Sequence, residues 1–148
     1  MAIDLQFIQS PDGEWDIDFE NGDFKMTDGL DTALYLSIFG EARASRSQIR
    51  DSRLRRGHFT NIFSNIEGYE IGNTSWINID QGKNTTNNLN QIIDQWNNGI
   101  KWMIDDNIIS KAEIKADNLG SSIIAEINIT SKSQQDSNYY NLFINTFN

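Results

Sequence analysis

His58 is the one histidine among the 148 residues, and its imidazole is the side chain best suited to acid–base or metal chemistry. A serine hydrolase would pair it with a nucleophilic serine, but the sequence contains no G-x-S-x-G segment. Zinc would have to bind through carboxylates and one imidazole, because the chain has no cysteine, and this is poor ligation for the ion. We therefore predict no catalytic residue, no metal and no cofactor here.

The 21 acidic residues suggest two further chemistries. The segment from Asp16 superficially resembles a calcium-binding loop, but Asn21 stands where such a loop needs glycine and Thr27 where it needs glutamate. A pair of carboxylates could also hydrolyse a glycosidic bond, one as acid and the other as nucleophile or base. Any chain this acidic offers such pairs, so a small carboxylate-dependent hydrolase of cell-wall glycan is kept as the alternative function.

All six arginines lie in one stretch, "RASRSQIRDSRLRRG", residues 43–57, although the chain carries a net charge of −9. Guanidinium groups pair with carboxylates through two parallel hydrogen bonds and stack on aromatic rings, so they favour specific interfaces over simple solubility. A pair of solvated faces of opposite charge would explain the same pattern. We predict a protein interface that includes Arg50, Arg53, Arg55 and Arg56.

The composition also limits the class of protein. A chain of 148 residues is most simply one domain, residues 1–148. Its acidic balance argues against nucleic-acid binding, which needs cations along the phosphates. It has no apolar run long enough to span a membrane and no signal-peptide pattern at its start, so we expect synthesis in the cytoplasm and no membrane partner.

The first third of the chain predicts a β-hairpin followed by a helix. Apolar and acidic residues alternate over 14–20, and Asn21-Gly22 separates this run from a second one over 23–27. The segment "TDGLDTALYLSIFGEAR" then has helical spacing, with Asp28 or Asp31 as its N-terminal cap. After the arginines, the Gly- and Asn-rich residues 57–76 predict an ordered but irregular crossing.

The remainder predicts a long helix and a second hairpin. An apolar stripe at helical spacing follows "GKNTTNN". Alternating runs over 111–117 and 122–131 are separated by 118–120, and "NYYNLFINTF" predicts a final strand. The fold class is therefore α+β: a small domain with an N-terminal β-hairpin, two main helices and a C-terminal antiparallel β-hairpin. The stripe comprises Leu89, Ile92, Ile93, Trp96, Ile100, Met103 and Ile104.

The C-terminal β-region is the second predicted interface. A two-stranded hairpin is marginal in water, so it needs a third strand or a covering helix. We expect this region, residues 111–131 with the "NYYNLFINTF" tail, to form an open edge. If the strand over 122–131 is that edge, proline at Glu126 or Asn128 would remove an edge N–H. Lysines at 111, 115 and 132 would guard this edge against aggregation. The predicted interface residues are Ile123, Ile127, Ile129, Tyr139, Tyr140 and Phe143.

Three motifs follow one another along the chain. The first is a "GD-φ-x-x-x-DGL-x-TA-φ" segment with an "SLF"-like helix, where φ is apolar. The second is "D-x-R-x-RRG" followed by aromatic residues, and the third is a long helix that ends in "W-φ-φ-x-DG". The matching residues are Asp23, Asp28, Gly29, Leu30, Thr32, Ala33, Ser37, Ile38 and Phe39; then Asp51, Arg55, Arg56, Gly57 and Phe59; then Trp102, Met103, Ile104 and Asp106. In this order the motifs resemble the baseplate wedge protein family of Mu-like contractile-tailed phages.

Two departures from the family pattern are visible. His58 and Phe59 stand where a pair of tryptophans is common, and Asn107 replaces the glycine after the long helix. Asparagine also tolerates a left-handed helix cap, so the second change costs little.

The resemblance implies a structural protein of the virion, similar to the sheath initiators of contractile tails and not an enzyme. Such a protein binds baseplate wedge proteins and hub or tail-tube proteins, and its β-edge nucleates the tail sheath. It is present in multiple copies, about six, around the tail axis.

Overall fold

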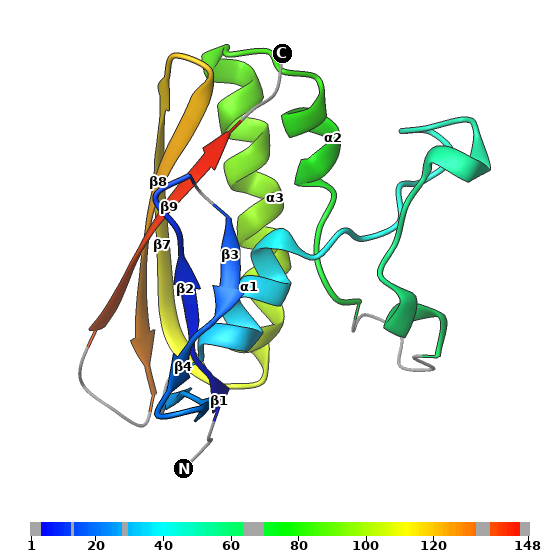
Figure 1. Ribbon diagram of the computed structural model, residues 1–148. Helices are drawn as coiled ribbons and strands as arrows, with labels where there is room; N and C mark the ends of the chain where they lie inside the picture. The colour runs from blue at the N-terminus through cyan, green and yellow to red at the C-terminus, as the bar shows by residue number, and fades with distance from the viewer. Residues whose placement is uncertain (1–3, 13, 28–29, 64–69, 133–136, 146–148) are drawn as a thin grey trace.

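The body of the molecule is one long helix packed on a three-stranded antiparallel sheet (Figure 1). The structure is a computed structural model, and it describes residues 4–12, 14–27, 30–63, 70–132 and 137–145. The sheet order is β7-β8-β9, so β8 lies in the middle. The predicted α+β class and the final strand are both confirmed. The elements of the body are α3 (Thr86–Asp105), β7 (Ile109–Leu119), β8 (Ser122–Ser131) and β9 (Ser137–Asn145).

Helix α3 has a defined cap at each end. The Thr85 hydroxyl accepts a hydrogen bond from the backbone N–H of Asn88, 3.2 Å away, and so satisfies one of the free donors of the first turn. At the other end Asn107 adopts φ 58°, and the N–H of Ile108 bonds to the carbonyl of Met103 at 2.9 Å. This is the left-handed cap that asparagine was expected to allow.

The apolar stripe of α3 forms the core together with the inner face of the sheet, as predicted. Trp96 is fully buried, and its indole N–H donates to the Ser75 hydroxyl at 3.1 Å. Ile104 is the exception, because 41% of its surface is exposed. The core cluster comprises Leu34, Ile38, Leu89, Ile92, Trp96, Ile100, Met103, Ile109, Ile123, Ala125, Ile127, Ile129 and Leu142.

Helix α1 (Asp31–Phe39) is shorter than predicted and begins differently. Leu30 occupies the N-cap position without a side-chain hydrogen bond, and Asp31 lies in the first turn, so Asp31 is not the cap. The other predicted cap, Asp28, lies outside the described residues. The helix ends because Gly40 turns to an extended conformation. The Trp102 indole N–H donates to the Ser37 hydroxyl at 2.9 Å and joins α3 to α1.

Residues 4–12 and 14–27 form a small three-segment unit, here called the N-terminal β-unit. The predicted hairpin is confirmed at its turn, where Phe19–Glu20 pairs with Asp23–Phe24 across Asn21 and Gly22, both of which have positive φ. Its outer parts pair instead with the first segment, residues 4–9. Each segment bends and pairs with both of the others. The strands are β1 (Asp4–Leu5), β2 (Phe7–Gln9), β3 (Trp15–Ile17), β4 (Phe19–Glu20), β5 (Asp23–Phe24) and β6 (Met26–Thr27).

A closed ring of backbone hydrogen bonds fixes the bends of this unit. The Gln6 N–H donates to the Lys25 carbonyl at 2.9 Å, the Lys25 N–H to the Asp18 carbonyl at 2.9 Å, and the Asp18 N–H to the Gln6 carbonyl at 2.8 Å. Lys25 and Asp18 also form an ion pair at 3.4 Å. A bent three-segment unit thereby satisfies backbone groups that a flat hairpin would leave at its edges.

The C-terminal hairpin turns two residues later than predicted. Strand β7 continues through Asn118 and Leu119, which pair with Ile123 and Ser122. The turn is Gly120-Ser121, where Gly120 has φ +60°. Glycine at the first central position is typical of a type II′ turn, which matches the twist of the flanking strands.

The segment between α1 and α3 contains a helix that the sequence did not predict. Helix α2 (Ser75–Asp80) has six residues, too few to display a helical period. The rest is irregular, with two 3₁₀ turns, η1 (Ser52–Leu54) and η2 (Phe59–Ile62). Residues 43–63 and 70–71 are here called the arm, because this part of the chain projects away from the helix-and-sheet body (Figure 1).

Candidate functional site

The arm leaves the body through a closely packed base. The Ala42 N–H donates to the Asn73 carbonyl at 3.0 Å, and the Asn73 N–H donates to the Gly40 carbonyl at 2.9 Å. Gly72 has φ +87°, and a Cβ atom there would collide with the backbone of Gly40. The two ends of the crossing can therefore lie against each other only because glycine occupies both positions.

Asn73 connects this base to two helices. Its buried amide nitrogen donates to the carbonyls of Ser37 at 2.7 Å and Ile38 at 2.8 Å, in the last turn of α1. Its amide oxygen accepts from the Ser75 N–H at 2.8 Å, at the start of α2. One side chain thus satisfies free backbone groups at the end of one helix and the beginning of the next.

Arg56 attaches the arm to α2. Its guanidinium contacts Glu41 and Asp80, each at 2.6 Å, and lies over the Trp76 ring at 4.4 Å from the centroid. The Trp76 indole N–H donates to the Ala42 carbonyl at 3.0 Å. Arg56 combines two ion pairs with aromatic stacking, the uses for which arginine is preferred to lysine.

Two further arginines hold the arm together internally. Arg43 donates to the carbonyls of Arg56 and Ser52, both at 3.1 Å. Arg55 is half-buried and donates to the carbonyls of Ile49 at 2.7 Å and Arg50 at 2.8 Å. These side chains replace the backbone ladder that an irregular segment lacks. Arg55 and Arg56, which the sequence assigned to an interface, are used within the chain itself.

The other three arginines point outward. Arg46 and Arg50 are exposed, and neither forms an ion pair within the described part of the chain. Arg53 is 87% exposed and contacts its near neighbour Asp51 at 2.9 Å. Its hydrogen bonds to the Asp51 carboxylate lower the pKa of that carboxyl and raise the pKa of Arg53. An interface role for Arg50 and Arg53 stays a prediction.

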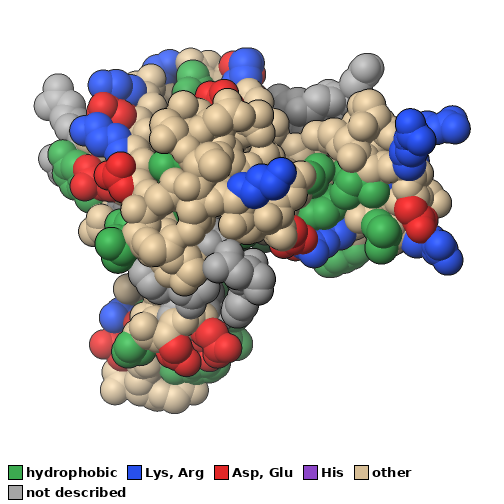
Figure 2. Space-filling model, turned by 90° about the horizontal axis from the view of Figure 1, so that it is seen from above, with side chains coloured by type: hydrophobic (Ala, Val, Ile, Leu, Met, Phe, Trp, Pro, Cys, Tyr) green, Lys and Arg blue, Asp and Glu red, His purple; other side chains and the backbone are tan. Residues whose placement is uncertain are grey.

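The arm also exposes large hydrophobic side chains. Leu54 follows Arg53, and Phe59 starts the η2 turn. Ile62 and Phe63 are 80% and 77% exposed. Figure 2 shows cationic side chains at the outer end of the arm and hydrophobic ones between this end and the body. Contiguous exposed hydrophobic groups of this kind mark interaction surfaces in soluble proteins. No sequence period indicated them, because they lie in an irregular segment.

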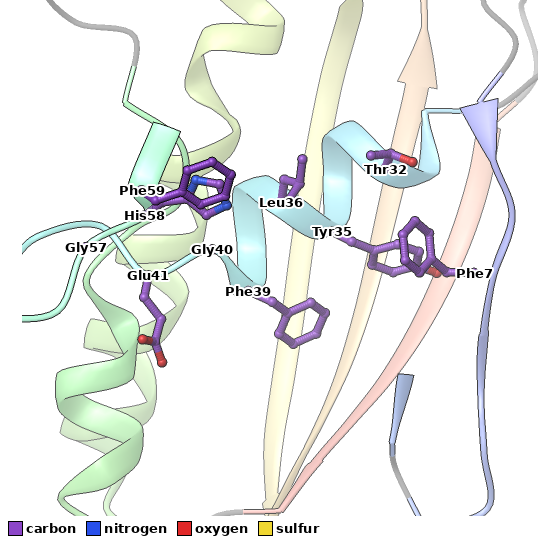
Figure 3. Close-up of a pocket in the computed structure, with 10 residues that line it drawn as sticks. All are labelled: Phe7, Thr32, Tyr35, Leu36, Phe39, Gly40, Glu41, Gly57, His58 and Phe59. Carbon is purple, nitrogen blue, oxygen red and sulfur yellow. The ribbon is translucent and has the colours of Figure 1, made fainter. Parts of the chain in front are cut away.

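A hollow of about 560 Å³ lies between the base of the arm and the outer face of α1 (Figure 3). Its walls include Phe7, Tyr35, Leu36 and Phe59. Burial raises the pKa of Tyr35 to about 12, and the Asp31 carboxylate contributes to the shift. A second hollow of about 440 Å³ shares Leu36 and extends along α1 toward Trp102. The lining of both is mainly apolar, so they suit a hydrophobic segment better than a charged substrate.

His58 has a structural role at the edge of the first hollow. Its Nδ1 lies 2.6 Å from the Thr60 hydroxyl and accepts from the Thr60 N–H at the start of η2. Its ring stacks on Phe59 with 5.1 Å between centroids. Within the described residues the hydrogen bonds of this imidazole are with Thr60, which makes it a helix cap.

The structure changes the assignment of the sheet edge. Strand β8 pairs with β7 on one side and β9 on the other, so the edge predicted within residues 111–131 and the tail does not lie at 122–131. Ile123, Ile127 and Ile129 have at most 2% of their surface exposed, and they belong to the core of this chain. These three side chains are therefore unavailable to a partner. Proline at Glu126 or Asn128 would disrupt a central strand.

The outer strands β7 and β9 are the edges of the sheet among the described residues. Tyr139, Tyr140 and Phe143 all lie in β9, paired with Asn128, Ile127 and Ile124. Tyr139 is exposed, whereas the side chains of Tyr140 and Phe143 lie outside the described residues. On β7, Lys111 and Lys115 each lie 3.8 Å from Glu113 on the solvent face. Charges on an outer strand fit the predicted protection against aggregation.

The described residues contain neither a metal-binding cluster nor a membrane-spanning helix. No group of three or more His, Asp or Glu side chains there is arranged to hold a metal ion. None of the helices in the same part of the chain is long and apolar enough to cross a membrane.

These features define a small single-domain α+β protein with an open sheet edge and a projecting arm. The sequence profile of the phage protein GP46 family matches residues 30–136, which is most of the chain, and the protein belongs to this family. The match extends from the start of α1 through β8, so it includes the arm and leaves out the N-terminal β-unit and β9. Neither the curated proteins nor the solved structures gave a match.

Proposed function

We propose that this phage protein is a structural component of a contractile tail baseplate. It binds baseplate wedge proteins and hub or tail-tube proteins, and it nucleates the tail sheath through an edge of the C-terminal sheet. The observation that carries the proposal is the open edge of β9, a strand paired on one side within the described residues. The phage family supports the setting, and the resemblance to the Mu-like baseplate wedge family supports the location in the tail.

Strand addition is the physical basis of the sheath contact. An outer strand presents a row of N–H and C=O groups that a strand from another chain can pair with. Residues that flank a two-residue turn form a hydrogen-bonded pair, so Leu119 and Ser122 bond to each other and the next residue, Ile123, bonds toward β9. Ile144 is the partner of Ile123, so its backbone N–H and C=O point toward β8. This direction alternates from one residue to the next along β9, so the N–H of Asn141 points away from β8.

The arm supplies a separate contact with wedge or hub proteins. Arg53 offers a guanidinium group in solvent, and Ile62 and Phe63 offer apolar surface. Aromatic residues and arginine are enriched at the centres of protein interfaces. The internal bonds of Arg55 and Arg56 hold this surface in a fixed position, which lowers the entropy lost on binding.

We propose no catalytic activity. His58 is bonded to Thr60, and one close pair of carboxylates, Glu41 and Asp80, is bridged by Arg56. A glycan hydrolase needs two carboxyl groups that face the glycosidic bond, whereas both of these are bonded to the guanidinium of Arg56. Peptidoglycan turnover by the purified chain, lost on a single Asp or Glu change, would instead support the hydrolase alternative.

The test uses a phage or prophage deleted for the gene and complemented with variants. Asn141→Pro removes an outward N–H and keeps the bonds of β9 to β8, whereas Asn141→Ala keeps the N–H as a matched control. We expect Asn141→Pro particles to contain the protein in their baseplates but to lack sheath, as seen by immunogold labelling and electron microscopy. Normal sheath on Asn141→Pro baseplates would refute the β9 edge, and tails without the protein would refute the baseplate role.

A further inference from the structure

Two projections of this molecule carry complementary surfaces. The arm is cationic and the N-terminal β-unit is acidic, and each exposes hydrophobic side chains. We propose that the arm of one copy binds the N-terminal β-unit of a second copy of this chain. This inference goes beyond the proposed function and does not depend on it, because it concerns contact between copies of the purified protein.

The arm side of the contact has charge without a partner. Between residues 43 and 63 the chain carries six arginines against one carboxylate, Asp51. Arg46 and Arg50 extend into solvent with no ion pair in the described part of the chain, and Leu54 lies exposed close to them in sequence. Three arginines serve the arm itself, so these outer guanidinium groups are the ones left to bind carboxylates on another molecule.

The β-unit side exposes both hydrophobic side chains and carboxylates. Phe19 and Phe24 pack together with 5.0 Å between ring centroids, yet they are 59% and 49% exposed. Ile8 and Met26 are exposed on the same unit. The exposed acidic side chains of this unit are Asp12, Glu14, Asp16, Glu20 and Asp23, and Glu20 and Asp23 are next in sequence to Phe19 and Phe24. Apolar side chains together with charged ones are typical of a protein interface.

One pairing in the β-unit independently favours an incoming cation. Glu20 and Asp23 lie directly opposite each other in the β4–β5 register. Like charges at opposite positions on paired strands are destabilising. Lys25 lies two residues after Asp23, but its ion pair is with Asp18. A guanidinium from another molecule would relieve this repulsion at the turn.

The arm and the N-terminal β-unit lie on different sides of the molecule, so a contact between them would join two molecules. In Figure 1 the arm projects to the right of the body, and the β-unit lies in front of the sheet on the left. Figure 2, seen from above, shows acidic and hydrophobic side chains on the lobe at the lower edge, away from the arm at the right. Joining unlike surfaces of identical chains gives a head-to-tail contact, which closes into a ring or extends as a helix.

The experiment is a charge swap followed by sedimentation velocity. One variant reverses the arm, Arg46→Glu with Arg50→Glu, and neither side chain takes part in the internal bonds of the arm. The other reverses the β-unit, Glu20→Arg with Asp23→Arg. A four-fold variant combines both and restores the net charge of −9. The matched control is Lys83→Glu with Lys111→Glu, which changes the charge of the body by the same amount as the arm variant.

We expect the wild-type chain to self-associate at about 50 mM salt and to dissociate as salt screens the contact. Each double variant at the arm or β-unit should weaken association about tenfold or more, because like charges then face each other. The four-fold variant, and an equimolar mixture of the two double variants, should associate again. The Lys83/Lys111 control should associate like wild type.

Three outcomes would overturn the proposal. The first is a wild-type chain that stays monomeric at every concentration and salt. The second is association that neither reversal weakens, and the third is a four-fold variant that fails to recover. Circular dichroism melts of each variant show whether it folds. The mixture provides a second check, because each of its chains keeps one unaltered surface.

Discussion

The body and the arm are stabilised in opposite ways. In the body, Trp96, Ile100 and Met103 of α3 are buried against the sheet, and burial of apolar surface supplies most of the stabilisation. In the arm, Arg43 and Arg55 bond to backbone carbonyls, while Ile62 and Phe63 stay in solvent. The arginine side chains of the arm therefore form hydrogen bonds within the arm, and its large apolar side chains stay exposed. A segment held in this way can present hydrophobic surface without collapsing onto the core.

The largest expected effect is in the body. Trp96→Ala should lower the free energy of unfolding by about 3–5 kcal/mol, because it leaves a large cavity in the core. Ile104→Ala on the same helix is the matched control, since Ile104 is partly exposed, and its cost should be within about 0.5 kcal/mol. Denaturant unfolding measures both. Equal costs would contradict the assignment of Trp96 to the core.

The base of the arm should be the next most sensitive place. Gly72→Ala combines a left-handed backbone with a collision against Gly40, so we expect a loss of about 1–3 kcal/mol. Gly120→Ala is the control, because it also has positive φ but has nothing within 4 Å of the added Cβ. Thermal melts that show no larger loss for Gly72→Ala than for Gly120→Ala would mean that the base relaxes easily.

Loss of the arginine anchor should loosen the arm and spare the body. Arg56→Ala removes two partly exposed ion pairs, so the free energy of unfolding should fall by only about 0–2 kcal/mol. Chymotrypsin should nevertheless cut faster at Phe59 and Phe63, because local opening of the arm becomes easier. Arg53→Ala, which loses only the contact with Asp51, is the comparison. Equal cleavage rates would show that Arg56 does not hold the arm.

The smallest effect concerns pH at the hollow between the two regions. The pKa of Tyr35 is raised from 10.0 to about 12, so the folded protein keeps this proton longer than the unfolded chain does. Stability from this group is present below pH 10 and is lost as the pH rises toward about 12. Tyr35→Phe should therefore lose less stability than wild type across that interval in denaturant melts. Parallel curves would show that Tyr35 is in ordinary solvent.

Local patterns in the sequence were sufficient for the regular elements. The stripe from Leu89 to Met103 predicted α3, and Asn21-Gly22 predicted the N-terminal turn. These signals work because burial on one face imposes a period, and a tight turn demands residues that accept positive φ. Helix α2 was missed because six residues are too short to show a period.

Which strand became the edge was decided by tertiary structure. Alternation from Ile123 to Ile129 indicated a strand with one buried face, but alternation is the same for a central and an outer strand. Pairing with β9 placed β8 in the middle of the sheet. Backbone hydrogen bonds form this pairing, so the side-chain pattern of neither strand predicts it.

The arginine stretch divides in the same way. The sequence by itself determined that six guanidinium groups would be crowded into residues 43–57 of an acidic chain. Only the fold decided that Arg43, Arg55 and Arg56 turn inward to carbonyls and carboxylates while Arg46, Arg50 and Arg53 face solvent. The physical reason is that an irregular segment has no period to assign its faces. The direction of each side chain there depends on which carbonyls and carboxylates distant parts of the chain bring within reach.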